Sequence, residues 1–352
     1  MSESAPATHA QPPGSARGRT LVRAAGGVLV SVACIAVVLR TVDPAATAAA
    51  LAAAQVPLVL LLVALVVGDV LIRSTRWHRL LQPVAALPWP TVVRFAWIGF
   101  LANAVLPARL GEVVRSVLLG RHAGISRTMV LGTVVVERVL DLLVLVALAA
   151  AGVLIAGTRL VPVELVVTGL ALAAVLVVGL VAFVTLRERG AGRRVSGLAE
   201  RAPRLAGLAA RLADGLAVVR DRRAVGAAVV LSIAAWTVGA VAWWVGAAAL
   251  GIALAPGDAI LVMAAVSLST AIPSGPGYIG SWELAAVAVL GLLGVDASAA
   301  LALGLLVHGA VLGVTIAGGA AAAVLPTLLG RRHAPRPAEV RGAEPTVEAG
   351  RP

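Results

Sequence analysis

The sequence predicts an all-α membrane protein, a polytopic helical bundle with about eight apolar elements, two of them broken or re-entrant. Of its 352 residues, 60% are hydrophobic and only 13% are charged, and the mean hydropathy is +0.99. An ordinary soluble domain is far less apolar than this. Long apolar runs alternate with arginine-bearing stretches, which is the pattern of helices that cross a bilayer and are joined by positive cytoplasmic loops.

The net charge of +12 comes from 29 basic residues, all of them arginine, and 17 acidic ones. Because the arginines lie mostly between the apolar runs, positive-inside topology explains them and no nucleic-acid partner is expected. The only cysteine, Cys34, allows no disulfide framework, and the five histidines have no metal-ligand spacing. Neither a metal nor another cofactor is expected.

One helical membrane domain is expected over residues 21–330, between two disordered cytoplasmic tails at residues 1–20 and 331–352. Both tails are polar and proline-bearing, so they cannot bury a core. Within the domain, segment 187–223 carries ten arginines against four acids. Its leucines recur at helical spacing, which predicts an amphipathic helix on the inner leaflet in an arginine-rich cytoplasmic loop.

Six full crossings are expected, starting near residues 21, 56, 128, 163, 225 and 299. This count places both termini and the 187–223 loop in the cytoplasm, and the chain in the cell membrane, plasma or inner, as a multi-pass protein. The tryptophans of the fifth crossing are expected at interfaces or in packing contacts, and His308 of the last is expected to be a core residue.

The second crossing, Val56–Ile72, ends in several charged residues. Asp69 lies one helical turn before Arg73, so the two side chains can pair. Arg76 follows on the same helix. An inner-leaflet anchor is the alternative interpretation of these arginines.

The segment Phe95–Leu106 is too short to cross about 30 Å of hydrocarbon as a helix. Arginines flank it on both sides. If both flanks are cytoplasmic, the segment enters the membrane and returns to the same side. The sequence therefore predicts a re-entrant element.

The re-entrant element leads into the stretch N-A-V-L-P-A-R-L-G-E-V-V-R at 103–115. Pro107 and Gly111 make a continuous helix unfavourable there, and such a break survives at membrane depth only inside protein or against water. Arg109, Glu112 and Arg115 are spaced by three residues, so Glu112 can pair with either arginine. Interfacial anchoring is the alternative to a functional charge cluster.

The third crossing contains E-R-V-L-D in its middle. Glu137 and Asp141 share a helical face, and Arg138 can neutralise both. Each charge at this depth costs about 2.5–3.5 kcal/mol on insertion scales. Function is one explanation, and a structural interhelical pair to Arg109 or Arg115 is the other.

A second break, P-S-G-P-G-Y-I-G-S-W-E at 273–283, separates two short apolar arms, Ile260–Ile272 and the run to Leu293. We expect backbone amides near Gly277–Gly280 to be free at the start of a helix carrying Glu283, where they can meet an anionic headgroup. The six-crossing count makes this break and the first one enter the membrane from opposite sides.

These landmarks, together with R-S-T-R-W at 73–77, resemble in order the lysylphosphatidylglycerol synthase transmembrane region family of flippase-like proteins. The resemblance implies a bundle that moves or binds a polar lipid. Tyr278 stands where a second glycine is usual, and the family's aminoacyl-transferring soluble domain is missing, which argues against lipid aminoacylation by this chain alone. Residues matching the family motifs are Arg73, Arg76, Asn103, Pro107, Arg109, Gly111, Glu112, Arg115, Glu137, Arg138, Asp141, Pro273, Pro276, Gly277, Gly280 and Glu283.

The predicted function is translocation of a phospholipid or lipid-linked headgroup between leaflets, without catalysis by this chain. Arg109 and Arg115 would hold phosphate, the carboxylates would balance charge or carry protons, and the Pro/Gly break would gate. Expected partners are membrane lipids with an anionic headgroup, and a lipid-modifying enzyme. The alternatives are a membrane-embedded glycosyl- or phospho-transferase, and a scaffold for a separate lipid-modifying enzyme.

Overall fold

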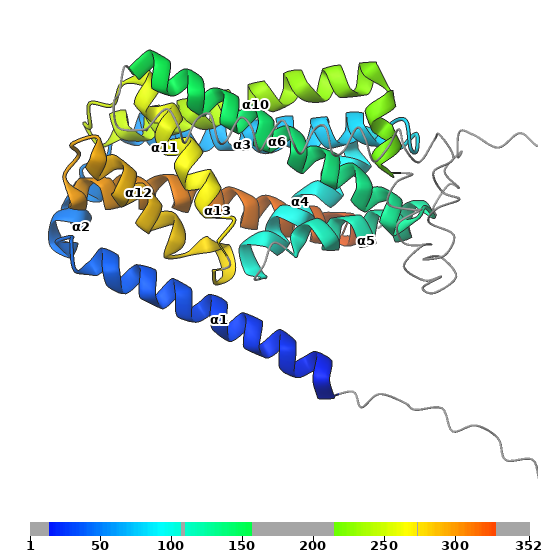
Figure 1. The fold of residues 1–352 in the computed structure, drawn as a ribbon, viewed down its shortest axis with the longest axis horizontal. Coiled ribbons are helices and arrows are strands. Elements are labelled where there is room, and N and C mark those ends of the chain that lie inside the picture. The colour runs from blue at the N-terminus through cyan, green and yellow to red at the C-terminus, as the bar shows by residue number, and fades with distance from the viewer. Residues whose placement is uncertain (1–13, 107–109, 157–214, 273, 329–352) are drawn as a thin grey trace, which may run out of the picture.

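The computed structural model describes residues 14–106, 110–156, 215–272 and 274–328, and within these ranges all the regular secondary structure is helical (Figure 1). The predicted all-α class is therefore confirmed. The α-helices are α1 (Gly14–Leu39), α2 (Pro44–Ala52), α3 (Val56–Leu81), α4 (Trp89–Val105), α5 (Gly111–Ala123), α6 (Arg127–Ala156), α10 (Arg222–Ala249), α11 (Pro256–Ser269), α12 (Ser281–Leu292) and α13 (Ala297–Leu328), and the short 3₁₀ helices are η1 (Ala217–Arg220) and η2 (Pro276–Tyr278).

Local sequence signals set where several helices begin. A proline stands in the first turn of α2, α3, α4 and α11, where its missing amide hydrogen costs nothing. The side chains of Asp43 and Asp221 accept backbone hydrogen bonds at the starts of α2 and α10. At the other end of a helix, Gly124 closes α5 with a left-handed backbone.

Among the described residues, α3, α10 and α13 are each long and apolar enough to cross a membrane, and α1 and α2 give a fourth span if they are taken together across their 88° bend. These agree with the crossings predicted near residues 21, 56, 225 and 299, although α1 begins at Gly14 and α2 was not expected. Helix α6 has 30 residues and carries the charged group in its middle. The crossing predicted at Val163–Leu186 lies outside the described residues, as do both predicted tails except residues 14–20, and so does most of the 187–223 loop.

Helices α3 and α10 form the antiparallel centre of the bundle. Gly246 lies against Leu62 near one end of the pair, and Ser232 bonds to Arg76 nearer the other. Small residues allow similar close contacts elsewhere, as where α13 passes the ring of Trp97 on α4 at Gly318. The main apolar core joins α3, α6, α10, α11, α12 and α13.

Helices α4 and α5 fold back on each other as an antiparallel hairpin. Gly111 approaches Gly99, its amide donates to Asn103 Oδ1 at 2.8 Å, and Phe95 contacts His122 near the open end. The loops that flank the hairpin, around Ala85 and Ile125, meet in one apolar cluster. Both flanks therefore lie at the same end of the bundle, as the re-entrant prediction requires.

Gly111 stands at the break that the sequence predicts, where α5 begins, and it also allows α4 and α5 to approach closely. It lies in the first turn of α5, and a Cβ there would collide with the carbonyl oxygen of Gly99 and lie 2.5 Å from Asn103 Oδ1. We expect Gly111→Ala to cost about 1–3 kcal/mol through overpacking and to lower the thermal unfolding temperature in detergent. Gly313→Ala is the control, because a Cβ there meets nothing within 4 Å. Equal melting of the two variants would show that the hairpin does not need this contact.

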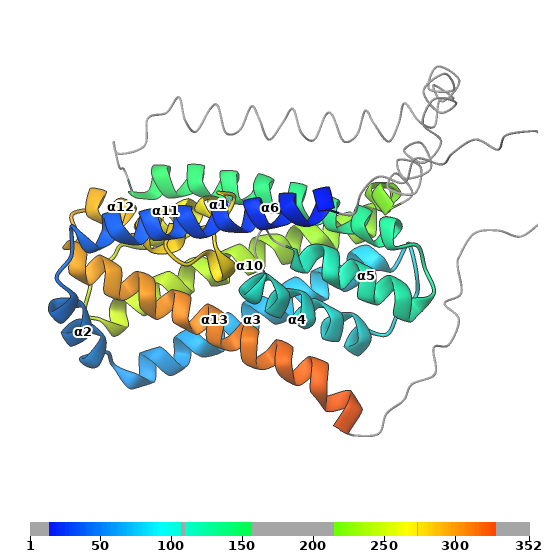
Figure 2. The ribbon, with the colours of Figure 1, turned by 90° about the horizontal axis from the view of Figure 1, so that it is seen from below.

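The second hairpin, α11–η2–α12, enters the bundle from the opposite end, and the two tips meet in the middle (Figures 1 and 2). A Cβ at Gly277 would lie 3.2 Å from the carbonyl oxygen of Ala104, near the tip of α4. Helix α1 packs against this tip, where the hydroxyl of Ser31 accepts a hydrogen bond from the amide of Gly275 at 2.9 Å. The arrangement agrees with the prediction of two broken elements entering from opposite sides.

The start of α1 and the end of α13 lie at one end of the bundle, together with the loop before α4, the loop after α5 and the start of α10 (Figures 1 and 2). That end also holds Arg79, Arg121, Arg127, Arg222 and Arg223. The start of α1 and the end of α13 thus lie at the same end of the bundle as these arginines.

Candidate functional site

Eight charged side chains from three helices form one connected network near the hairpin tips. Four are arginines and four are carboxylates, so the formal charges cancel. Every member lies within 4.0 Å of at least one partner of opposite charge. The members are Asp69, Arg73 and Arg76 of α3, Glu112 and Arg115 of α5, and Glu137, Arg138 and Asp141 of α6.

Arg76 is the centre of the buried half of the network. Its side chain is fully buried and bonds to Glu137 at 2.6 Å, to Asp141 at 2.5 Å and to the hydroxyl of Ser232 at 2.8 Å. Arg115 closes the set with a 2.5 Å bond to the second oxygen of Glu137. Buried charges need this degree of pairing, because an unpaired ion in a low-dielectric interior costs several kcal/mol. This half therefore ties α3, α5, α6 and α10 together.

The other half of the network is accessible. Arg138 exposes 35% of its side chain while it pairs with Asp141 at 3.1 Å and with Glu112 at 3.4 Å. Asp69 holds the Nε of Arg73 through both carboxylate oxygens, at 2.8 and 2.9 Å. Arg73 and Arg138 line one cavity together, and an incoming anion can approach them there.

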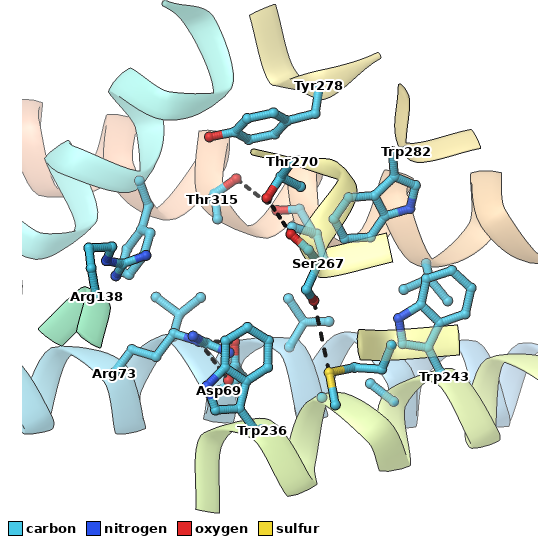
Figure 3. A pocket seen from close by; sticks show the side chains of 18 residues that line it. Asp69, Arg73, Arg138, Trp236, Trp243, Ser267, Thr270, Tyr278, Trp282 and Thr315 are labelled. Atoms are coloured by element: carbon cyan, nitrogen blue, oxygen red, sulfur yellow. Dashed lines mark hydrogen bonds and ion pairs between the residues drawn. The ribbon is translucent and has the colours of Figure 1, made fainter. Parts of the chain in front are cut away.

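A cavity of about 250 Å³ opens beside this accessible half (Figure 3). Asp69, Arg73 and Arg138 lie on one side, and Trp243 and Trp282 lie on the opposite side. The hydroxyl groups of Ser267, Thr270, Tyr278 and Thr315 stand between them, and the remaining wall is mainly apolar. The cavity thus combines a cationic edge, a row of hydroxyl groups and an apolar surface.

A smaller polar cavity of about 40 Å³ lies between α4, α5 and α6. Asn103, Glu112, Arg115 and Arg138 line it, and Arg138 and Phe100 also line the larger cavity. A space of this size is large enough for water where polar groups surround it. Arg138 and Phe100 therefore separate the large cavity from a polar space at the tip of the first hairpin.

The geometry tests one of the two pairings that the sequence allows for Glu112, and it confirms the predicted interhelical pair between the third crossing and Arg115. Glu112 does not pair with Arg115, although the two are three residues apart on α5. Arg115 turns instead to Glu137, and Glu112 pairs with Arg138, both on α6. The reason is burial: contacts across the α5–α6 interface satisfy both charges, while a pair along α5 would leave Glu137 short of one partner. Arg109 and Pro107 lie outside the described residues.

The second break also differs from its prediction. The amide of Gly280 is not free, because it donates to Glu283 Oε2 at 2.6 Å, and the amides of Gly275 and Tyr278 are occupied too. Gly277 and Gly280 have φ values of +65° and +94° and pack against α4 and α1. The backbone therefore caps itself and presents no anion site at Gly280. Pro273 lies outside the described residues.

Tyr278 explains how the chain tolerates its departure from the family pattern. Its φ is +61°, and among the described residues it is the only residue other than glycine with positive φ. The position thus keeps the left-handed backbone that a glycine adopts easily, and a side chain costs some strain there. In return the ring lines the large cavity.

Of the predicted site residues, Arg73 and Arg138 line the large cavity, and Asn103, Gly111, Glu112 and Arg115 line the small one. Arg76, Glu137 and Asp141 lie behind them in the buried half, and Pro276, Gly277, Gly280 and Glu283 form the tip of the second hairpin. Sequence reasoning missed the wall residues. The signal available was the grouping of hydroxyl and aromatic residues in otherwise aliphatic helices: Trp236, Trp243, Ser267, Thr270, Trp282 and Thr315.

Comparison with known sequences supports the resemblance noted above. Residues 24–319 match the sequence model of a family described as the lysylphosphatidylglycerol synthase TM region. The matched range contains the charge network, both hairpins and every residue that lines the large cavity. No curated protein and no solved structure matches the chain.

Proposed function

The chain belongs to the lysylphosphatidylglycerol synthase TM region family of membrane domains, and from this premise we propose that it translocates a phospholipid or lipid-linked polar headgroup between leaflets. The observation that carries the proposal is the cavity beside Arg73 and Arg138. Guanidinium groups engage phosphate with paired hydrogen bonds, and the hydroxyl groups suit the polar atoms of a headgroup.

The size of the cavity favours a headgroup over a whole lipid. Sites that enclose drug-sized ligands occupy about 300–1,000 Å³, and the cavity here holds about 250 Å³. A phosphate with its polar substituent can fit, while the acyl chains stay in the bilayer. The small cavity behind Arg138 and Phe100 continues the polar space to the first hairpin, and we propose that the headgroup moves along this direction.

The buried carboxylates support transport over catalysis by this chain. Glu137 and Asp141 each accept from two or more arginines, and Trp236 also donates to Asp141 at 3.1 Å. These contacts occupy both oxygens of each carboxylate, so neither carboxylate has a free position for a general acid or base. The same contacts make them unsuited to carry protons. They balance the arginines that hold the phosphate.

We further propose that the arginine-rich end of the bundle faces the cytoplasm and that the protein resides in the cell membrane. The asymmetry of arginine between the two ends supports this orientation. An anionic phospholipid is the proposed partner. A separate lipid-modifying enzyme is proposed as a second partner, because such an enzyme would supply the modified headgroup.

Arg138→Gln is expected to reduce retention of anionic phospholipid by about tenfold or more, because hydrogen bonds to a charged group contribute about 1.5–3 kcal/mol. Native mass spectrometry of the purified protein after graded delipidation, with phosphatidylglycerol as the probe, measures this. Arg94→Gln is the control, since Arg94 bonds to the carbonyl of Ala322 away from the cavity. Arg138→Lys should recover part of the binding. Equal lipid loss from both Gln variants would contradict a headgroup site at Arg138.

A further inference from the structure

A buried histidine and a buried glutamate meet at the tip of the second hairpin. His308 Nδ1 lies 2.6 Å from Glu283 Oε1, and His308 Nε2 lies 2.8 Å from the carbonyl oxygen of Gly277. The exposed fractions of the two residues are only 3% and 7%. The charge network described above does not include this pair, and the proposed path of the headgroup does not use it.

The hydrogen-bond partners determine how many protons the pair holds. A carbonyl oxygen only accepts, so Nε2 of His308 must carry a hydrogen. Glu283 Oε2 is already occupied by the amide of Gly280 at 2.6 Å. The 2.6 Å contact between Nδ1 and Oε1 then requires one more proton, on either atom, because two lone pairs would otherwise face each other. The observed conformation therefore binds one proton between the two side chains.

Few other ionisable groups can influence the pair. Helix α2 has none, and the charged residues of α10 lie in its first turn. From α3, Asp69 and Arg73 face the cavity as an internal pair, and from α6 Arg138 faces it from the same side. On α4, Arg94 bonds to Ala322, and on α11, Asp258 lies in the first turn, at the far end from the break. Cys34 is the titratable group on the described side-chain part of α1, and the phenol of Tyr278 is the one on η2.

The pair is linked directly to the cavity wall. The ring of Trp282 stacks on His308 with centroids 4.6 Å apart, and Trp282 lines the cavity. Gly277, whose carbonyl holds His308, precedes Tyr278, which lines the cavity as well. The carboxylate of Glu283 in turn accepts from the amide of Gly280 and so caps the start of α12. Loss of the shared proton would separate the ring from the carboxylate, and so disturb both the wall and the cap.

We propose that His308 and Glu283 form a proton-binding site that couples proton movement to rearrangement of the second hairpin. The proton sits between Nδ1 and Oε1, and its release frees the Gly277–Glu283 segment to move against the tip of α4. The role of this site in transport rests on the proposed function, lipid translocation. The existence of the proton site does not depend on that function, so the two can be tested apart.

Glu283→Gln is the direct test. The amide oxygen can still accept from Gly280, and the amide NH₂ can donate to a neutral His308, so the conformation is held without the shared proton. Infrared difference spectra of the purified protein in lipid nanodiscs, between acidic and alkaline buffer, should lose one carboxyl and imidazole signal in this variant. Asp258→Asn, which removes a half-buried carboxylate in the first turn of α11, should keep that signal.

His308→Gln removes the ring and must lose the imidazole part of the signal, so the result does not depend on the folding of one variant. Persistence of an unchanged signal in both variants would overturn the proton site. In vesicles with an imposed pH gradient, movement of a fluorescent anionic phospholipid should change several-fold with the gradient for the natural protein and not for Glu283→Gln. Gradient-independent movement in the natural protein would overturn the coupling alone. Absence of any lipid movement would overturn the proposed function, while the infrared signal still decides the proton site.

Discussion

Arg76→Met should abolish accumulation of the folded protein in the membrane or lower its unfolding temperature severely. Arg76 is fully buried and is the centre of a network that includes Glu137, Asp141 and Ser232. Methionine has a similar length and keeps most of the packing, so the main effect is loss of the positive charge. Breaking a buried ion pair from one side costs about 3–5 kcal/mol, because the partners remain buried without compensation.

Arg79→Met is the matched control for this prediction. Arg79 lies on the same helix, three residues later, and is exposed. Thermal unfolding of both variants in the same detergent, followed by the monomeric fraction on size-exclusion chromatography, gives the comparison. If Arg76→Met melts like the natural protein, the buried half of the network contributes nothing to stability and its residues must be kept for another reason.

The local parts of the site could be predicted from the sequence. Asp69 and Arg73 are one helical turn apart, and so are Glu137 and Asp141, so their proximity follows from helix geometry alone. The breaks could also be predicted, because proline and glycine interrupt apolar runs that are too short to span a membrane. The all-α class of the fold and the approximate positions of most crossings could be predicted from the same patterns.

The long-range contacts could not be predicted. Arg76 and Ser232 are 156 positions apart, and only the antiparallel packing of α3 and α10 brings them together. The exchange of partners between Glu112 and Arg115 follows from the α5–α6 interface. His308 was expected to be a core residue and is indeed buried, but its bond to Glu283 depends on how α12 and α13 pack. No spacing within the sequence encodes these contacts.

Gly239→Phe should stop lipid movement without unfolding the bundle. Gly239 lies on α10 and lines the large cavity, and a Cβ there would lie 3.7 Å from Met263 Cγ, an ordinary contact distance. A phenyl ring at this position would occupy much of the space of about 250 Å³ that the headgroup needs. Since the ring fills existing space and leaves the charge network intact, the thermal stability of the protein should change little.

Gly226→Phe is the control on the same helix. Gly226 is exposed, and a Cβ there meets nothing within 4 Å. Each variant replaces one glycine of α10 by phenylalanine, but only the ring at position 239 enters the cavity. Circular dichroism and thermal unfolding of each variant establish that the comparison is made between folded proteins.

The deciding measurement is transbilayer movement of a fluorescent anionic phospholipid in vesicles that contain the natural protein, Gly239→Phe or Gly226→Phe, read as the fraction of label that reaches the opposite leaflet with time. The proposed function predicts rapid movement with the natural protein and Gly226→Phe, and movement at the rate of protein-free vesicles with Gly239→Phe. Equal rates for the two phenylalanine variants, or no movement with the natural protein, would contradict translocation through this cavity.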